Sequence, residues 1–263
     1  MTQTIRLEKE SAFYHLILDR QDKRNAFDEH MIAHMIASLD TVRADKSARG
    51  LIIRSSSAHF CAGGDIAWMQ RSAQMSEREN FDDARQLAQL MYQLFSLEVP
   101  TLSLVSGAVF GGGLGLVACT DSAIATEDAI FCLSEVRLGL IPAVIGPYIM
   151  RAMGHRRAQH FILTANRFSA QVAYQAGLVH ELVQSTDDLS SASDDWCEAI
   201  NSGAPIALAV AKQFCHEMHD RDMSESIIDI TAACIASLRS SPEGQEGTKA
   251  FLEKRTPDWG HRE

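Results

Sequence analysis

The chain has 263 residues, of which 46% are hydrophobic and 22% charged, a composition typical of globular proteins and unlike that of disordered or fibrous ones. Its 34 acidic and 24 basic residues give a formal net charge of -10, and no basic run is longer than the Lys23-Arg24 pair. We therefore expect no nucleic-acid or anionic-membrane partner, although a local basic spot remains compatible with a small anionic ligand.

The cysteines and the N-terminus indicate the compartment. The six cysteines include no C-x-x-C pair, and the chain begins MTQTIRLEKE, without the apolar core of a signal peptide. No stretch approaches the roughly 18 apolar residues of a membrane-spanning helix. The ten histidines show no metal-ligand spacing tied to an acidic partner. We expect a reduced, cytoplasmic protein without a metal site or membrane insertion.

The first third of the chain mixes strand and helix signals. Apolar and polar residues roughly alternate over residues 4–8 and 12–19, which predicts a hairpin. Asp28 is placed to cap a helix that runs to about residue 42. The apolar run 51–53 follows Gly50 and predicts a buried strand.

The later elements change from mixed to mainly helical. Ser76 and Glu79 form a capping box for a helix ending near residue 98, and the apolar run 101–105 predicts another buried strand. A further strand is expected at 121–125. Helical spacing then recurs at 156–164, 170–176, 188–200, 206–218 and 226–237. We predict an α/β domain over residues 1–200, followed by a helical C-terminal subdomain over residues 201–263.

Two glycine-rich segments, residues 62–65 and 111–115, each lie between a strand candidate and a helix candidate. Without Cβ atoms, such segments can point two amides at one oxygen and form an oxyanion hole. Tight packing or a turn explains each cluster about equally well. A dinucleotide fingerprint, G-x-G-x-x-A, also fits residues 113–118. The interval 106–112 is too long for its tight turn, and the fingerprint leaves the first glycine segment without a role.

Glu135 is a lone carboxylate between apolar stretches. Desolvation in such surroundings raises the pKa of a carboxyl group toward neutrality, where general acid/base catalysis works best. An ordinary salt bridge, with Arg137 as a poorly spaced partner, is the alternative that spacing alone favours. The sequence leaves both interpretations open at this point.

Several ordered motifs together resemble the enoyl-CoA hydratase, or crotonase, superfamily. They are RNAF at 24–27, FCAGGDI at 60–66, VSGAVFGGG at 105–113, SEVRLGLIP at 134–142, LTA at 163–165, AGLV at 176–179 and FLEKR at 251–255. The resemblance covers nearly the whole chain. It implies a crotonase-like spiral of β-β-α units with a helical C-terminal part, a homotrimer or dimer of trimers, and acyl-CoA substrates. The apolar positions of residues 226–251 also favour oligomerisation.

The resemblance also implies roles for individual residues. The amides of Gly64 and Gly112 would form the oxyanion hole, and Glu135 would move protons. Coenzyme A would enter as the substrate thioester, with no further cofactor. The residues resembling its contacts are Arg24, Ala26, Ala62, Asp65 and Ile66, joined by Phe251 and Lys254 near the C-terminus.

One position departs from the family pattern. Hydratases of this family commonly use two glutamates, and the earlier one aligns with Gly115. The segments 115–119 and 133–148 resemble a bacterial branch of methylglutaconyl-CoA hydratases. Hydration of an enoyl-CoA, with 3-methylglutaconyl-CoA as the candidate substrate, is therefore our first interpretation. A double-bond isomerase that uses a single glutamate and a non-catalytic acyl-CoA binding subunit are the alternatives.

Four further side chains are weaker candidates. Trp68 and Met69 follow the first glycine segment and either line an acyl pocket or, more commonly for apolar residues, belong to the core. Tyr148 and Arg151 are candidates for contacting a distal carboxylate of the substrate.

Overall fold

The structure is a computed structural model and describes residues 4–259. Its main sheet has six strands in the order β1-β2-β3-β4-β6-β9. These strands are β1 Ile5–Glu10, β2 Phe13–Leu18, β3 Gly50–Ser55, β4 Thr101–Val105, β6 Ser122–Thr126 and β9 Glu181–Val183. Within this sheet β1 and β2 pair antiparallel, as the predicted hairpin requires, and the other neighbours pair parallel. The predicted α/β class is confirmed.

A smaller sheet lies beside the main one, with its strands in the order β5-β7-β8. The strands are β5 Ala108–Phe110, β7 Ile130–Cys132 and β8 Phe168–Ser169. β5 follows β4 closely and β7 follows β6 closely, so the chain passes from the main sheet to the small sheet and then into helix. This succession is the predicted spiral of β-β-α units.

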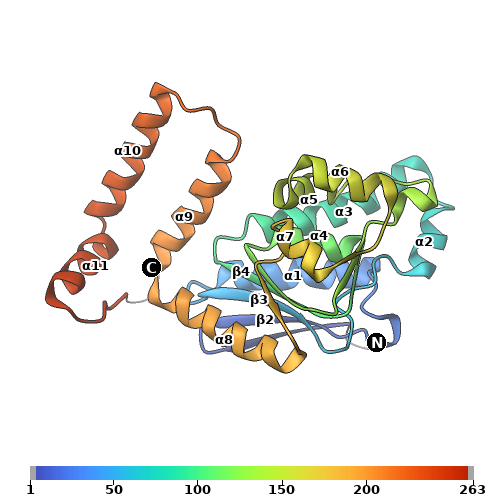
Figure 1. Cartoon of the computed structure of the whole chain (residues 1–263), viewed down its shortest axis with the longest axis horizontal. Coiled ribbons are helices and arrows are strands. Elements are labelled where there is room, and N and C mark those ends of the chain that lie inside the picture. Colours follow the sequence, from blue (N-terminus) through green and yellow to red (C-terminus); the bar gives the residue numbers. More distant parts are fainter. Residues whose placement is uncertain (1–3, 260–263) are drawn as a thin grey trace.

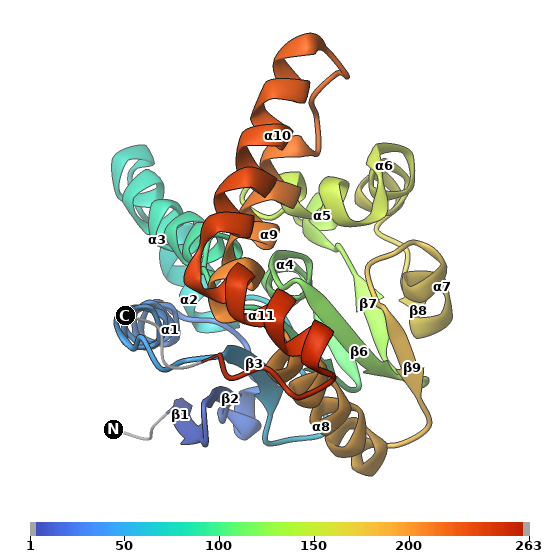
Figure 2. The ribbon, with the colours of Figure 1, turned by 90° about the vertical axis from the view of Figure 1, so that its left-hand side faces the viewer.

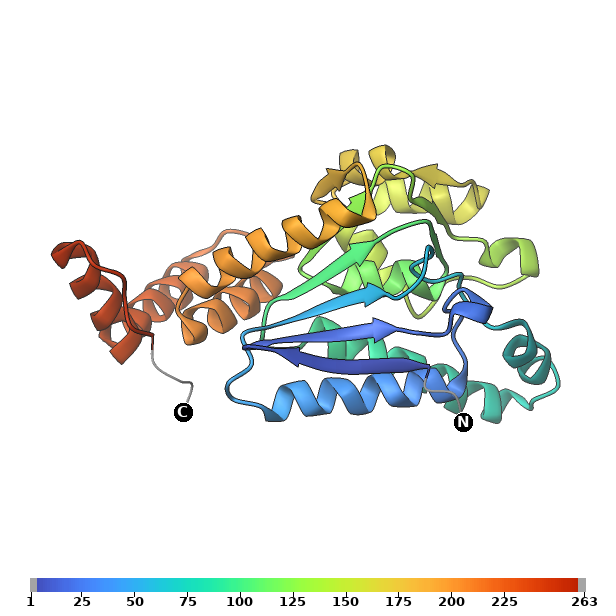
Figure 3. The same cartoon turned by 90° about the horizontal axis from the view of Figure 1, so that it is seen from below.

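Helices cover both faces of the main sheet (Figure 3). In the sheet domain they are α1 Glu29–Ala44, α2 Ile66–Ser72, α3 Glu77–Phe95, α4 Gly112–Cys119, α5 Gly146–Met153, α6 His155–Thr164, α7 Ala170–Gln175 and α8 Thr186–Ser202, with short 3-10 turns η1 Gln21–Lys23 and η2 Glu135–Leu138. Ile52 of β3 packs in the cluster under α8, whereas its neighbours Leu51 and Ile53 pack in the larger core with α1, α3 and α4. Burial on both faces explains why these strands are continuous apolar runs in the sequence.

The predicted helix starts are present. The Asp28 side chain accepts a 2.8 Å hydrogen bond from the Met31 amide and caps α1. Ser76 and Glu79 form the reciprocal capping box that begins α3. Among residues 4–259, no helix is long and apolar enough to cross a membrane.

Three helices extend from one end of the sheet domain and form a C-terminal arm (Figures 1 and 2). They are α9 Pro205–Met218, α10 Glu225–Ser240 and α11 Pro242–Glu253. Lys212 of α9 fixes the base of the arm, because its Nζ lies 2.7 Å from Asp121 Oδ2 and 3.2 Å from the Val99 carbonyl oxygen. The His216 ring also stacks on Phe95 at 4.0 Å.

Hydrogen bonds join the first and last helices of the arm, and the arm exposes apolar side chains. Both carboxylate oxygens of Glu243 in α11 accept hydrogen bonds from the amides of Ile206 and Ala207 at the start of α9. The exposed apolar residues of the arm are Ile206, Met223, Ile228, Ile230, Ile235, Phe251 and Leu252. The boundary expected between residues 200 and 201 falls in the last turn of α8, and the division into two folding units stays a prediction.

Candidate active site

The two glycine-rich segments lie side by side, and the second of them directly follows β5. Cys61 and Val109 form a parallel bridge. In this bridge the Cys61 amide donates to the Ala108 carbonyl at 3.0 Å, and the Phe110 amide donates to the Cys61 carbonyl at 2.9 Å. The pairing sets residues 62–64 beside residues 110–112, because both chains continue in the same direction.

Each segment offers one backbone amide. Phe27 and Gly64 form a second parallel bridge. In it, the Phe27 amide donates to the Gly63 carbonyl and the Asp65 amide donates to the Phe27 carbonyl, both at 2.7 Å, so the Gly64 amide takes no part. Gly112 is the first residue of α4, where helix geometry gives an amide no intrahelical acceptor. Neither amide has a hydrogen-bond acceptor among residues 4–259. Both are therefore free to donate to a ligand.

The carboxyl group of Glu135 lies against the second glycine segment. A Cβ atom on Gly111 would be 3.2 Å from Glu135 Oε1, and the φ angle of Gly111 is 49°, a left-handed value that favours glycine. Glu135 Oε2 is buried and has no hydrogen-bond partner among residues 4–259. Burial raises the pKa of this carboxyl group above its usual value, and a hydrogen bond from its own backbone amide offsets only part of that effect.

The salt-bridge interpretation of Glu135 does not match the geometry. Arg137 is exposed on the surface of η2, and within the described part of the chain Glu135 forms no ion pair. Glu135 is instead half-buried, with one buried carboxyl oxygen that has no partner among residues 4–259, which suits a general acid/base.

The dinucleotide fingerprint is excluded by the positions of its glycines. Gly113 and Gly115 lie inside α4, not in a strand-to-helix turn. A Cβ on Gly113 would be 2.7 Å from the Cys61 Cβ, and one on Gly115 would be 2.3 Å from the Ile145 Cγ2. These glycines are therefore required by packing, and they cannot face a pyrophosphate.

Ile145 occupies the space that a side chain at position 115 would need. Besides the 2.3 Å approach to Ile145, a Cβ on Gly115 would lie 3.3 Å from the Met91 Cε. Ile145 itself is 3% exposed. Apolar packing of Ile145 thus fills the place of the missing first glutamate. The sequence did not reveal this contact, because Ile145 is thirty positions further along the chain.

Most residues predicted to contact coenzyme A line one cavity of about 310 Å³. Its lining residues are Asp22, Lys23, Arg24, Ala26, Ala62, Gly64, Asp65 and Ile66. The Ala62 amide donates to the Arg24 carbonyl at 3.0 Å and joins the two walls. Ile66 is 75% exposed at the start of α2, whereas the Asp65 carboxylate accepts from the amides of Ala67 and Trp68.

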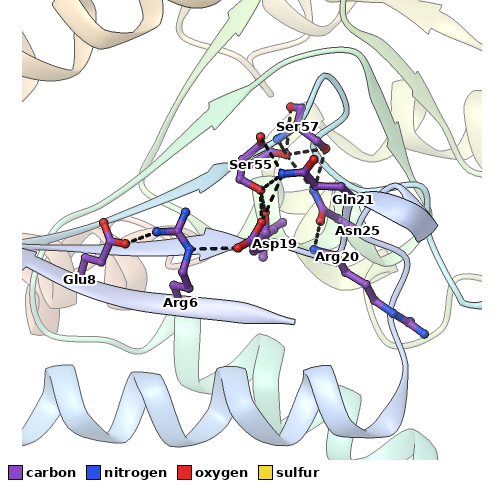
Figure 4. A network of polar contacts seen from close by, with 10 residues as sticks. Arg6, Glu8, Asp19, Arg20, Gln21, Asn25, Ser55 and Ser57 are labelled. Carbon is purple, nitrogen blue, oxygen red and sulfur yellow. Dashed lines mark hydrogen bonds and ion pairs between the residues drawn. The ribbon is translucent and has the colours of Figure 1, made fainter. Parts of the chain in front are cut away.

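Asn25 shapes this cavity, although sequence analysis assigned it no role. Its φ angle is 56°, and its side chain is fully buried. Asn25 Oδ1 accepts from the Arg20 amide at 2.8 Å, and Nδ2 donates to Ser55 Oγ (Figure 4). Nδ2 also donates to the carbonyls of His59 and Phe60. Asparagine tolerates the left-handed region better than most residues, and these bonds hold it there. The signal in the sequence was an asparagine in the segment that joins β2 to α1.

Trp68 and Met69 lie beside the Gly64 amide. A Cβ on Gly64 would be 3.5 Å from the Met69 Sδ and 3.6 Å from the Trp68 Cζ3. The indole Nε1 donates to Asp83 Oδ1 at 3.1 Å, which fixes the ring. Trp68 also packs on the main core, so the core and pocket interpretations both hold for it.

Phe251 and Lys254 are not brought into this site within one chain. They lie at the end of α11, which is at the opposite end of the molecule from α2 (Figures 1 and 3). Phe251 is 82% exposed. If these residues contact coenzyme A, the cofactor must be bound by a different copy of the chain.

The comparisons with known proteins agree with this arrangement. A family model described as enoyl-CoA hydratase/isomerase matches residues 8–262. The human enoyl-CoA hydratase domain-containing protein 2, mitochondrial, is 30% identical over 247 residues, covering 92% of this chain and 83% of the relative. A crystal structure of an enoyl-CoA hydratase from Shewanella pealeana is 43% identical, with a TM-score of 0.94 and coverage of 98% and 96% of the two chains. An enoyl-CoA hydratase/isomerase from Marinobacter aquaeolei is 32% identical, with a TM-score of 0.91 and coverage of 97% and 98%. This chain belongs to the enoyl-CoA hydratase/isomerase family and has the crotonase fold.

Proposed function

We propose that the protein hydrates the 2,3 double bond of an enoyl-CoA thioester. The observation that carries the proposal is the half-buried Glu135 side chain, with its buried Oε2, beside the glycine segment that begins α4. The amides of Gly64 and Gly112, which have no acceptor within the described residues 4–259, lie on adjoining segments of the same site. Together these groups supply a base and two hydrogen-bond donors for an enolate oxygen.

The reaction needs one proton to move twice. The amides of Gly64 and Gly112 bind the thioester oxygen and draw electron density from C3. Glu135 takes a proton from water as the water oxygen bonds to C3, and an enolate forms. The same carboxyl group then gives its proton to C2. Both additions come from the side of Glu135, so syn hydration results and the carboxylate is regenerated.

For the acyl group we propose 3-methylglutaconyl-CoA, and the support is the resemblance of segments 115–119 and 133–148. Arg151 contributes nothing to that choice. Its guanidinium donates to the His216 carbonyl at 2.9 Å and lies 5.5 Å from the Phe95 ring, so it faces α9. Tyr148 likewise packs on Phe95.

Double-bond isomerisation is a second candidate, and Ile145 is the observation that favours it. Isomerisation moves a proton between two carbons and needs one base and no bound water. The apolar packing of Ile145 at Gly115 removes the place of a second water-holding carboxylate. A non-catalytic binding subunit is less well supported, because Glu135 is retained with a raised pKa.

Mass spectrometry of enoyl-CoA incubated with the protein in H₂¹⁸O separates these functions. Hydration adds one heavy oxygen to the product, isomerisation shifts the double bond without a gain of oxygen, and a binding subunit leaves the substrate unchanged. Product that contains no heavy oxygen would reject the hydratase proposal. Crotonyl-CoA and 3-methylglutaconyl-CoA should be compared, because a preference for the latter tests the proposed acyl group.

We also propose that the chain assembles as a trimer or a dimer of trimers, in which Phe251 and Lys254 of one copy reach the coenzyme A of another. The exposed apolar residues of the arm support assembly, and light scattering should give a multiple of three times 28.9 kDa. Mixed oligomers of Glu135→Gln chains and Phe251→Ala/Lys254→Ala chains should regain turnover, since some sites then combine both intact parts. Absence of complementation would contradict the shared site. Cytoplasmic location stays a prediction.

A further inference from the structure

We propose that Arg20 is a positioning residue for the Gly64 amide, an inference that rests on the thioester chemistry proposed above. Arg20 follows β2, and its side chain is 17% exposed. Its guanidinium Nη1 donates to the Ala26 carbonyl at 2.9 Å and lies 3.1 Å from Asp28 Oδ2. Nη2 lies 3.1 Å from Asp65 Oδ2. One side chain thus binds three acceptors on both segments that wall the coenzyme A cavity.

The two carboxylates that Arg20 binds begin two different helices. Asp28 Oδ1 accepts from the Met31 amide and caps α1. Asp65 Oδ1 accepts from the amides of Ala67 and Trp68 and caps α2. Each carboxylate therefore uses one oxygen for a helix and the other for Arg20. The guanidinium couples the starts of α1 and α2, and its planar fork suits this task better than a lysine ammonium group.

Gly64 is located between these fixed points. The residue after it, Asp65, is held by Arg20 through its side chain and by Phe27 through its amide. The Asp65 side chain is 5% exposed, so its carboxylate has little water to replace a lost partner. Without Arg20, the buried carboxylates of Asp28 and Asp65, which now share its guanidinium, would repel each other. The expected result is a shift of the Gly64 amide away from the thioester oxygen.

Residues 24–26 of the cavity wall have attachments besides Arg20, which allows the effects on catalysis and on coenzyme A affinity to be measured apart. The Asn25 side chain bonds to Ser55 (Figure 4) and to the carbonyls of His59 and Phe60. Residues 24–26 therefore keep these attachments when the bond from the Arg20 guanidinium to the Ala26 carbonyl is lost. The Arg20 side chain points away from this serine cluster. Loss of the guanidinium should therefore affect catalysis more than affinity for coenzyme A.

The test compares Arg20→Met and Arg20→Lys with the control Asp45→Asn. Asp45 holds the other end of α1 through Lys9, Tyr14 and Ser47, far from the cavity. For Arg20→Met we expect kcat to fall by about 10- to 100-fold, the usual cost of a misplaced catalytic group, while the Kd of free coenzyme A changes less than about threefold. Arg20→Lys should lose less kcat than Arg20→Met, because the ammonium group can still bind part of the acceptor set. Asp45→Asn should lower the melting temperature and keep kcat.

A spectroscopic probe makes the test independent of turnover. Bound 4-dimethylaminocinnamoyl-CoA should absorb at longer wavelength when amides polarise its carbonyl group, and Arg20→Met should reduce that red shift. Folded Arg20→Met with the kcat and red shift of the wild type would overturn the inference, as would an equal loss of kcat in Asp45→Asn. If Arg20→Met does not fold, Arg20→Lys with unchanged kcat and red shift overturns it. A wild-type protein with neither turnover nor red shift would instead reject the proposed function.

Discussion

The Phe27 ring packs so closely on Gly112 that a Cβ atom there would lie 2.8 Å from Phe27 Cε2 and 2.9 Å from Cδ2. The backbone of Phe27 also bonds to the residues on either side of Gly64. A single buried residue therefore contacts both glycine segments, through its ring on one side and its main chain on the other. The spacing of the two amides depends on it.

Gly112→Ala should reduce turnover on the order of 10²-fold, because the new methyl group must push the Gly112 amide or the Phe27 ring aside. It should also destabilise the fold by about 1–3 kcal/mol through overpacking. Gly64→Ala is the matched comparison, since its Cβ would meet Met69 at an ordinary 3.5 Å. We expect its loss of turnover to stay below about tenfold. Steady-state kinetics and urea unfolding of both variants check this, and equal losses would contradict the packing argument.

Glu135→Gln keeps the volume of the side chain and removes the titrating proton. If Glu135 is the sole acid/base, turnover should fall on the order of 10²- to 10⁴-fold, toward the upper part of that range because Gly115 offers no second carboxylate. Acyl-CoA affinity should be roughly kept. Glu127→Gln, an exposed glutamate after β6, is the control and should keep wild-type turnover. A folded Glu135→Gln protein within a few-fold of wild type would show that another residue moves the proton.

The raised pKa of Glu135 also predicts how stability and activity depend on pH. The folded state favours the protonated carboxyl group, so its stabilising contribution is complete below the ordinary value of 4.5 and is lost as the pH rises through the raised pKa. Urea unfolding should therefore find Glu135→Gln more stable than wild type at neutral pH, with the gap closing below pH 4.5. In the wild type, kcat/KM should decline on the acid side with a midpoint above 4.5, because the base must be ionised. A gap that stays constant with pH would contradict the burial argument.

Restoring the first glutamate should fail unless Ile145 is reduced. Gly115→Glu places its Cβ where Ile145 Cγ2 lies, and we expect a loss of at least about 1–3 kcal/mol in the free energy of unfolding. Ile145→Ala alone should cost about 2–5 kcal/mol through the cavity it leaves. The double variant should cost less than the sum, with an interaction energy of about 0.5–3 kcal/mol, because the two side chains share one space. Additive losses in a double-mutant cycle would refute that sharing.

Local signals in the sequence were sufficient for the longer elements. Asp28, the Ser76 and Glu79 pair and the apolar run 101–105 each act through residues a few positions away, and the helices and strands they predict are present. The three-residue strands β5 and β7 were missed, because so short a run has no measurable period. The helical spacing predicted at 226–237 belongs to α10, and Pro242 begins the separate helix α11 just after it.

The residues of the site likewise include some that local signals predict and some that depend on contacts between distant parts of the chain. The glycine segments and Glu135 carry their signal in their own residue types, so the sequence could name them. The contacts of Ile145 with Gly115, of Phe27 with Gly112, and of Arg20 with Asp65 join residues 30 or more positions apart. Nothing in the local pattern specifies which distant side chain fills a given space. Whether the named residues perform catalysis stays a prediction for the experiments above.

The cap that Glu243 places on α9 has a consequence for the order in which the chain folds during synthesis. The first amides of α9 receive their carboxylate from a helix that leaves the ribosome some forty residues later. The strands of the main sheet precede α9 in the chain and need nothing from that helix to pair. The sheet domain should therefore mature first, as domains generally do in N- to C-terminal order, while the arm waits for the last residues of the chain. Nascent chains stalled before residue 243 should carry a protease-resistant sheet domain and a protease-sensitive α9.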